Sequence, residues 1–325
     1  MASWGVRTAG LVALAWLAAC GPPRYTAGAS GVDIDAEQLM ADVFVLAADD
    51  MEGRLVGTPG SARARAYVEM RSAEAGNRPF PGGYLQPFTF EDDETGEAIE
   101  GVNVLGVIEG ARADRVIVVS AHYDHEGVKN GEIYNGADDN ASGVAALLQI
   151  AQRFAGRAPQ HTLVFAAFDA EEGQHAGATQ FVADPPVAFG TIALNVNLDM
   201  VSQSEVDELY LAGGFHSPWL SPWLEWIAND ASVTLLQGHD SPAWGEGQDW
   251  TWESDHDAFH AAGVPFLYFG VEDHPRYHQP TDDPETIPVD FFVRSTASIV
   301  RAVEILDQEL DAVVEARAVW REAQP

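Results

Sequence analysis

The chain has 325 residues, of which 46% are hydrophobic and 30 are glycine, a composition typical of a globular protein rather than a disordered one. Its formal net charge at pH 7 is -33, and its pI is about 4.3. Because nucleic-acid phosphates and anionic lipid surfaces repel such a chain, nucleic-acid binding and electrostatic adsorption to a membrane are both disfavoured.

The N-terminal residues have the pattern of an export signal. Leu11 to Ala19 is uninterrupted apolar sequence, too short to span a bilayer but suited to a signal peptide. It ends at Cys20 in Leu-Ala-Ala-Cys, which resembles the lipobox of bacterial lipoproteins, and this lone cysteine cannot form an internal disulfide. We expect a signal peptide over residues 1–19, lipidation of Cys20, a flexible tether over 20–32 and one folded domain over 33–325. The protein would then be an exported lipoprotein, periplasmic or on the outer membrane or cell surface, held to the membrane by its lipid alone; the alternative is a secreted protein.

Predicted helices and strands alternate along the rest of the chain, which is typical of an α/β fold. Apolar spacing predicts, in chain order, helices over 35–50 and 59–75, strands over 84–90, 102–108 and 116–119, a helix over 144–154, a strand over 161–169, a helix over 174–182, strands over 191–198 and 206–212, a helix over 217–231, a short helix opened by residues 254–256, a strand over 264–269 and a helix over 288–321. The strands over 84–90 and 102–108 are expected at the sheet edge.

Three of the buried strands are followed by acidic or imidazole side chains. His122 and Asp124 end the first, Glu171 and Glu172 follow the second, and Asp199 follows the third. Ligands of open α/β sheets bind beyond the carboxyl ends of the strands, so these side chains are expected to share a site. A metal-bound histidine usually donates its second N–H to a carboxylate, and Asp124 could be that partner of His122.

Two other segments allow two interpretations each. The acidic loop 135–143 precedes a helix, and its carboxylates either serve the site or cap that helix. Six of the nine tryptophans lie between residues 219 and 252, where they either pack in the core or form the walls of a substrate cleft.

Together these motifs resemble the co-catalytic zinc exopeptidases of metallopeptidase family 28, which include bacterial leucyl aminopeptidases and glutamate carboxypeptidase. The resemblance covers roughly residue 46 to the C-terminus, and its five motifs occur in the family's order at similar spacing. They are His122-Tyr123-Asp124, the loop 136–143, Glu171-Glu172, Leu198-Asp199-Met200 and Tyr277-His278. The resemblance implies a three-layer α/β/α sandwich with a mixed, mostly parallel central sheet.

The resemblance also implies a role for each matched position. Asp139, rather than Asp138, would bridge two zinc ions and be followed by a cis peptide bond. His122 and Asp199 would complete one zinc site, Glu172 and His278 the other, and Glu171 would be the general base. Apart from these matched ligands, four neighbouring residues are candidates for supporting the ligands or contacting the peptide substrate: Asp124, Asp255, Arg276 and Tyr277.

Two further assignments concern neighbouring residues. Some aminopeptidases of this family have a tyrosine four residues before the aspartate of the Ser-Asp-His motif, and here Thr251 takes its place. Oxyanion stabilisation must then come from elsewhere, with the metals alone as one candidate. Asp255 either caps a helix or supports the site, and His125 is interpreted as a structural or surface residue.

Several functions remain open at this stage. An aminopeptidase is favoured because an acidic cleft suits a cationic α-amine. A carboxypeptidase or dipeptidase would need a cation for the C-terminal carboxylate, for which Arg276 is the candidate. Glutaminyl cyclases share the scaffold but work with a single zinc, and the complete ligand set argues against them. A lipid-tethered zinc-binding module without activity is the remaining alternative. No feature of the sequence indicates the oligomeric state.

Overall fold

The computed structural model describes residues 31–93, 95–245 and 247–324. The expected signal peptide, Cys20 and nearly all of the expected tether lie outside the described residues. Val32 and Ile34 are 2% and 5% exposed and pack into the main core, so the core includes Val32, which lies one residue before the expected domain boundary. Within the described residues, no helix has the length and apolar character needed to cross a bilayer.

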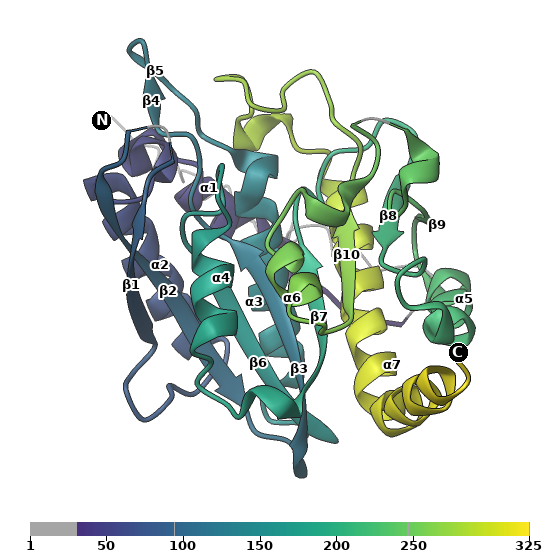
Figure 1. The fold of residues 1–325 in the computed structure, drawn as a ribbon. Coiled ribbons are helices and arrows are strands. Elements are labelled where there is room, and N and C mark those ends of the chain that lie inside the picture. The colour runs from purple at the N-terminus through teal and green to yellow at the C-terminus, as the bar shows by residue number, and fades with distance from the viewer. Residues whose placement is uncertain (1–30, 94, 246, 325) are drawn as a thin grey trace, which may run out of the picture.

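One mixed sheet of eight strands forms the centre of the described chain (Figure 1). Its strands, in sheet order, are β1 (Leu85–Glu91), β2 (Ala98–Ile108), β6 (His161–Phe168), β3 (Arg112–His122), β7 (Ile192–Leu198), β10 (Phe266–Gly270), β8 (Glu208–Ala212) and β9 (Thr234–Gln237). The four central strands run parallel to one another, and the sheet becomes antiparallel where β2 pairs with β6 and β8 with β10. The central strands are buried on both faces, which explains their uninterrupted apolar sequences.

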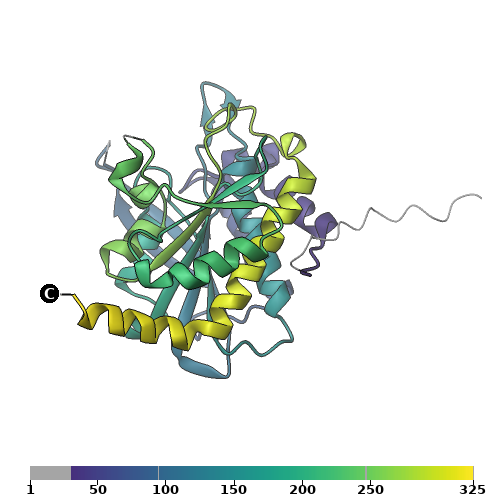
Figure 2. The ribbon, with the colours of Figure 1, turned by 90° about the vertical axis from the view of Figure 1, so that its right-hand side faces the viewer.

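Helices cover both faces of the sheet, which confirms the expected three-layer architecture. One face carries α1 (Ala36–Leu46), α2 (Pro59–Glu74), α3 (Gly143–Phe154), α5 (Ser221–Asp230) and α7 (Val289–Glu322), and the other carries α4 (Ala176–Ala183) and α6 (His256–Ala261). Figure 2 shows the long α7 running beside α5. Separate apolar cores lie on the two faces, the larger one under α1, α3 and α7.

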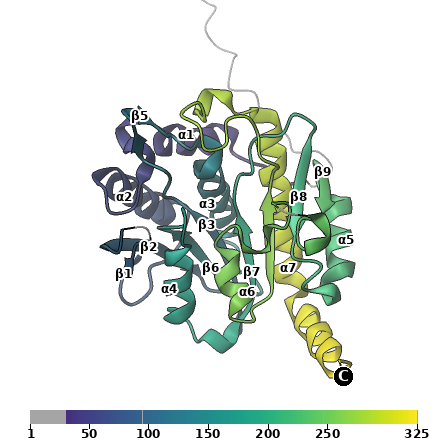
Figure 3. The same ribbon diagram turned by 45° about the horizontal axis from the view of Figure 1, so that its top comes forward.

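Most predicted elements form within a few residues of their expected bounds, and local sequence explains where two helices begin. The side chain of Asp35 accepts a hydrogen bond from the N–H of Gln38 and caps α1, while Thr58 caps α2 ahead of Pro59. The sequence did not predict β9 or the small hairpin of β4 (Val128–Lys129) and β5 (Glu132–Ile133). That hairpin lies in the loop after β3 and stands at the same edge of the sheet as the loop after β10 (Figures 1 and 3).

Candidate metal centre and active site

The predicted site residues gather at the carboxyl ends of the parallel strands. His122 is the last residue of β3, Glu171 follows β6 after a short turn, and Asp199 directly follows β7. Because β6, β3 and β7 are parallel neighbours, their ends meet at one edge of the sheet. The loop after β10 brings His278 to the same edge.

A first group of potential metal donors consists of His122, Asp139 and Asp199, all buried. The Nε2 atom of His122 lies 3.3 Å from Oδ1 of Asp139 and 3.2 Å from Oδ1 of Asp199. Ligands held tetrahedrally at about 2.0–2.1 Å from one zinc ion lie about 3.3 Å from each other. These nitrogen and oxygen donors therefore fit one ion.

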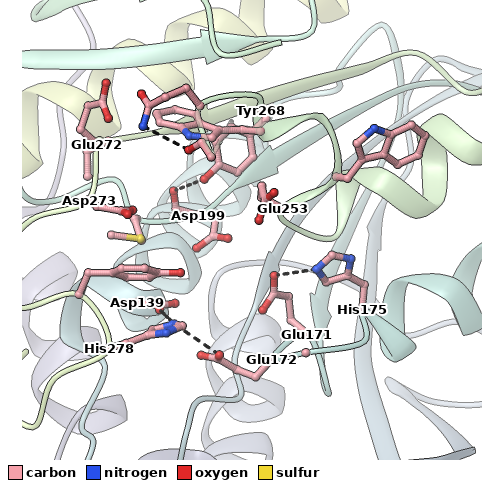
Figure 4. A pocket seen from close by; sticks show the side chains of 18 residues that line it. Asp139, Glu171, Glu172, His175, Asp199, Glu253, Tyr268, Glu272, Asp273 and His278 are labelled. Carbon is pink, nitrogen blue, oxygen red and sulfur yellow. Dashed lines mark hydrogen bonds and ion pairs between the residues drawn. The ribbon is translucent and has the colours of Figure 1, made fainter. Parts of the chain in front are cut away.

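A second group uses the other oxygen of the same aspartate. The Nε2 atom of His278 lies 3.1 Å from Oδ2 of Asp139 and 3.5 Å from Oε2 of Glu172 (Figure 4). Asp139 thus presents Oδ1 to His122 and Oδ2 to His278, as a carboxylate between two ions would. The structure brings all five predicted ligands together.

The loop before α3 fixes the orientation of Asp139. The peptide bond between Asp139 and Asn140 is cis, as the resemblance implies. The side chain of Asn140 donates to the carbonyl of Leu198 and accepts from the N–H of Gly143, so it joins this loop to the end of β7 and to the start of α3. Gly136 has a φ of +56°, and a Cβ there would lie 2.0 Å from the carbonyl oxygen of Asp139.

Asp138 turns away from the metal donors. One of its carboxylate oxygens accepts hydrogen bonds from Ser142 and Ser202, and the other lies 3.0 Å from Nε2 of His274. Of the two adjacent aspartates, only Asp139 belongs to the groups of potential metal donors found in the described chain.

The imidazoles around Asp139 determine its charge. Burial acts to raise the pKa of Asp139, but the neighbouring His125, His122 and His278 outweigh it and hold that pKa well below its ordinary value. Asp139 is therefore a carboxylate anion at neutral pH, the form that can bind a metal.

Asp124 supports the site mainly through backbone groups. Its carboxylate accepts hydrogen bonds from the N–H groups of Glu171 and Glu172, at 3.1 and 3.3 Å. Its contact with His122 is looser, because Nδ1 of that ring lies 3.7 Å from the Asp124 carboxylate and 3.2 Å from the Asp124 carbonyl. The predicted carboxylate partner of His122 thus also holds the turn that carries both glutamates.

Glu171 lies beside the donor groups without joining either of them. Its Oε2 is 3.9 Å from Nε2 of His122, and its Oε1 is 3.4 Å from Nε2 of His175. The other ring nitrogen of His175 lies 2.8 Å from Asp257 on α6, so these three side chains form a row. Burial, together with Asp199 and Glu172, raises the pKa of Glu171 well above its ordinary value, against the opposing effect of His122.

The helix-cap interpretation of Asp255 is wrong. This residue occupies the position before α6, but its side chain makes no capping hydrogen bond. It is fully buried, and burial raises its pKa to about 8. It lies close enough to Glu171 to raise the pKa of that residue as well. Thr251 is also buried and hydrogen-bonds to His216 and Asp249.

A cavity of about 400 Å³ opens over the donor groups. Its acidic lining residues are Asp139, Glu171, Glu172, Asp199, Glu253, Glu272 and Asp273. Among its described lining residues none is Lys or Arg. Tyr277 lines the cavity and stacks on His278 at 3.9 Å, whereas Arg276 lies outside the lining and contacts Gln203. Trp250 and Trp252 line it too, while Trp219 and Trp223 pack against the main core, so the tryptophans divide between the two predicted environments.

A model of Peptidase family M28 matches residues 103–303. The chain belongs to peptidase family M28. The match covers the central strands, the loop with Asp139 and the loop with His278.

Curated relatives of this M28 chain are longer than it is. A probable glutamate carboxypeptidase of Arabidopsis thaliana is 30% identical over 244 residues, which are 67% of this chain and 32% of that protein. Aminopeptidase YwaD of Bacillus subtilis strain 168 is 30% identical over 207 residues, 58% of this chain and 41% of that protein. The chain therefore spans less than half the length of these two relatives.

Solved structures with the same fold include a glutaminyl cyclase of Tannerella forsythia. It superimposes with a TM-score of 0.67, covers 83% of this chain and 98% of its own, and is 19% identical. Because the two sequences are only 19% identical, this structural similarity supports the fold of the M28 chain but not its function.

Three residues of the M28 site escaped prediction from the sequence. His125, interpreted as structural or surface, is fully buried against Glu172, and neither His175 nor Tyr268 was singled out although both line the cavity. For His125 a signal existed, since it lies three residues after His122. The sequence did not show, however, that the chain turns back toward the donors at that point.

Proposed function

We propose that the protein is a zinc-dependent aminopeptidase that removes N-terminal residues from peptides with two zinc ions. The contacts that place Asp139 between His122 and His278 support the pair of ions, since nitrogen and carboxylate oxygen are ligands that zinc accepts. His122, Asp139 and Asp199 would hold one ion, and Asp139, Glu172 and His278 the other. When bound, the ions would polarise the scissile carbonyl and lower the pKa of a coordinated water.

Glu171 is the proposed general base. Its carboxylate lies 3.9 Å from Nε2 of His122 and lines the cavity, but it belongs to neither donor group. Its raised pKa suits a group that must take a proton from water and later release it to the leaving amine. Tyr277 also lines the cavity, and its hydroxyl is a candidate donor to a developing oxyanion, since position 251 has no tyrosine. The hydroxyl of Tyr268 donates instead to the carbonyl of Asp199 at 3.4 Å.

The acidic lining of the cavity is the observation that favours an aminopeptidase over a carboxypeptidase. An aminopeptidase must accommodate a cationic α-amine, and Glu253, Glu272 and Asp273 line the cavity beyond the metal donors. A carboxypeptidase must hold an anionic carboxylate, for which Arg and Lys are the usual partners. Arg276, the candidate for that task, lies outside the lining.

A carboxypeptidase or dipeptidase remains the second candidate because of the relative named as a probable glutamate carboxypeptidase. Aminoacyl p-nitroanilides, their N-acetylated forms and N-blocked dipeptides separate the two. We expect cleavage of the free aminoacyl anilides only, lost with a chelator and in Glu171→Gln, and unchanged in Arg276→Ala. Cleavage of blocked dipeptides that disappears in Arg276→Ala would replace the aminopeptidase proposal. A chelator-insensitive protein would refute both candidates and leave a module without metallopeptidase activity.

We also propose that the protein is exported and anchored through lipidated Cys20. This proposal is supported by the apolar run before Cys20 and by the absence of any other cysteine in the sequence. Labelling of cells with radioactive palmitate tests it. We expect label in the wild-type protein and none in Cys20→Ala, which would leave the membrane fraction. An unlabelled wild-type protein recovered from the medium would favour simple secretion.

A further inference from the structure

His125 forms a short contact with the second donor group. Its ring is fully buried, and its Nδ1 atom lies 2.6 Å from Oε1 of Glu172 and 3.8 Å from Oδ2 of Asp139. These three residues also form a possible metal-binding group of their own. His125 could therefore act either as an additional metal ligand or as a partner of Glu172.

The distances decide between these two roles. Pairs of donors around one zinc ion are about 3.3 Å apart, and the two contacts of His278, with Asp139 and Glu172, are 3.1 and 3.5 Å. At 2.6 Å, the contact of His125 with Glu172 is too short for two ligands of one ion. It matches a hydrogen bond to a charged acceptor.

The two oxygens of Glu172 therefore have different neighbours. Oε2 faces His278, whereas Oε1 is held by His125. We propose that His125 is a positioning residue, which donates its Nδ1–H to Oε1 of Glu172 and so leaves Oε2 as the single oxygen directed at the second metal. Partners of this kind fix the orientation of a ligand and typically change metal affinity about 10- to 100-fold when they are removed.

The surroundings of His125 hold the ring rigidly. A Cβ built on Gly136 would lie 2.5 Å from Cδ2 of His125, so the backbone at Gly136 packs directly against the imidazole. The Nε2 atom finds no hydrogen-bond partner among the described residues. The bond to Glu172 is therefore the one hydrogen bond that the structure records for this ring. Its loss would free the side chain of Glu172 to rotate.

The assignment has a consequence for the chemistry of the second metal. With His125 outside the coordination shell, that metal would have the three protein ligands Asp139, Glu172 and His278. Glu126 is also a potential donor beside them, but it faces the other ring nitrogen of His278, Nδ1, at 3.7 Å. Three protein ligands leave a position free for water or substrate, as in catalytic zinc sites, whereas a fourth would give the closed shell of a structural site. The inference thus rests on the proposed two-metal centre, and it gives the second ion, like the first, three protein ligands and an open position.

Cadmium-113 bound to the full protein tests the assignment directly. Scalar coupling between cadmium and imidazole protons passes only through a metal–nitrogen bond, so correlation spectra show which histidines are ligands. We expect signals from two imidazoles, those of His122 and His278, and the same two in His125→Ala. A third coupled imidazole that vanishes in His125→Ala would make His125 a ligand and overturn the proposal.

Zinc affinity supplies the second test, by competition with a chromophoric chelator. We expect His125→Ala to weaken one of two zinc sites about 10- to 100-fold. His125→Asn, whose amide N–H replaces Nδ1–H, should recover most of that loss. The matched control is His260→Ala, a histidine of α6 that contacts His216 and Trp252. Its two affinities should equal those of wild type.

The outcomes separate this inference from the proposed peptidase activity, because neither measurement uses a substrate. Unchanged zinc affinity in His125→Ala would refute the positioning role. If His125→Ala does not fold, the number of coupled imidazoles in the wild-type cadmium spectrum and the zinc affinity of His125→Asn still test the positioning role. A protein that binds two metals and depends on His125, yet cleaves no peptide, would refute the peptidase and leave the role of His125 standing.

Discussion

Replacing Arg54 by methionine tests whether one buried cation holds the loop that connects two of the proposed metal donors, His122 and Asp139. Arg54 is fully buried, and its guanidinium donates four hydrogen bonds to backbone carbonyls. The acceptors are Tyr123 at 2.8 Å, Leu46 at 2.7 Å, Asn135 at 2.6 Å and Gly136 at 2.9 Å. Tyr123 lies at the start of the loop after β3 and Gly136 lies at its end, so a single side chain closes that loop.

The expected cost follows from these contacts. Methionine has a similar length but no donor. The carbonyl of Gly136 would still accept from the N–H of Ala141, whereas those of Tyr123, Leu46 and Asn135 would lose this donor. A buried polar group left without its partner costs about 1–3 kcal/mol, or about 3–9 kcal/mol for three. Part of this is offset because burial of the cation is itself unfavourable, as shown by the pKa of Arg54, which burial lowers to about 10.

We therefore expect Arg54→Met to lower the free energy of unfolding by about 3–6 kcal/mol, a large part of the total of about 5–15 kcal/mol for a typical protein. Urea unfolding in the presence of a chelator measures this change without a contribution from metal. The control is Arg63→Met on α2, where a half-exposed arginine pairs with Glu52 and about 1 kcal/mol or less is at stake. Equal losses in the two variants would show that the closure of the loop does not depend on Arg54.

Three further changes probe other parts of the site. Gly136→Ala would place a Cβ 2.0 Å from the carbonyl of Asp139 at a positive φ, so we expect a lower melting temperature and weaker zinc binding; a wild-type melting curve would contradict this. Burial lowers the pKa of His256 to about 3, while in the unfolded chain its pKa is near 6.5. Between these two values only the unfolded state takes up the proton, so the free energy of unfolding decreases as the pH decreases. Between pH 7 and pH 5, unfolding measurements should show wild type losing about 2 kcal/mol more than His256→Gln. Asp257→Asn should loosen His175, which contacts the proposed general base, and lower kcat on the order of tenfold with KM unchanged; a change confined to KM would assign the pair to substrate binding.

The apolar strands made the positions of the proposed metal donors predictable from the sequence. A run such as that before His122 identifies a strand and also the point where it ends, and parallel strands end at a common edge. The fold class, the convergence of the donors and the distinction between Asp138 and Asp139 followed from these runs together with the family resemblance. β9 was missed because its four residues, Thr234–Gln237, lie at the far edge of the sheet and are only partly buried.

What the sequence could not predict depends on contacts between distant segments. An aspartate before a helix usually caps it, but Asp255 is buried near Glu171 by the packing of α6, and no local pattern encodes that environment. The contact of His125 with the site was not predicted for the same reason. Its partner Glu172 lies 47 residues later in the chain, and the contact exists only because β3 and β6 are neighbours in the sheet.

The density of carboxylates at this edge of the sheet links metal binding to folding. Asp139, Glu172 and Asp199 serve two donor groups and Glu171 stands beside them, and the described cavity lining contributes no Lys or Arg to offset their repulsion. Part of that repulsion already shows in the raised pKa of Glu171. An ion that binds only the folded chain stabilises it by about 4 kcal/mol at a concentration 1,000 times its Kd. A chelator should therefore lower the melting temperature of wild type clearly. The chelator should lower the melting temperature of a variant without Asp139 much less, because both donor groups depend on this one residue. Equal shifts in melting temperature in the two proteins would mean that the stabilising metal binds elsewhere.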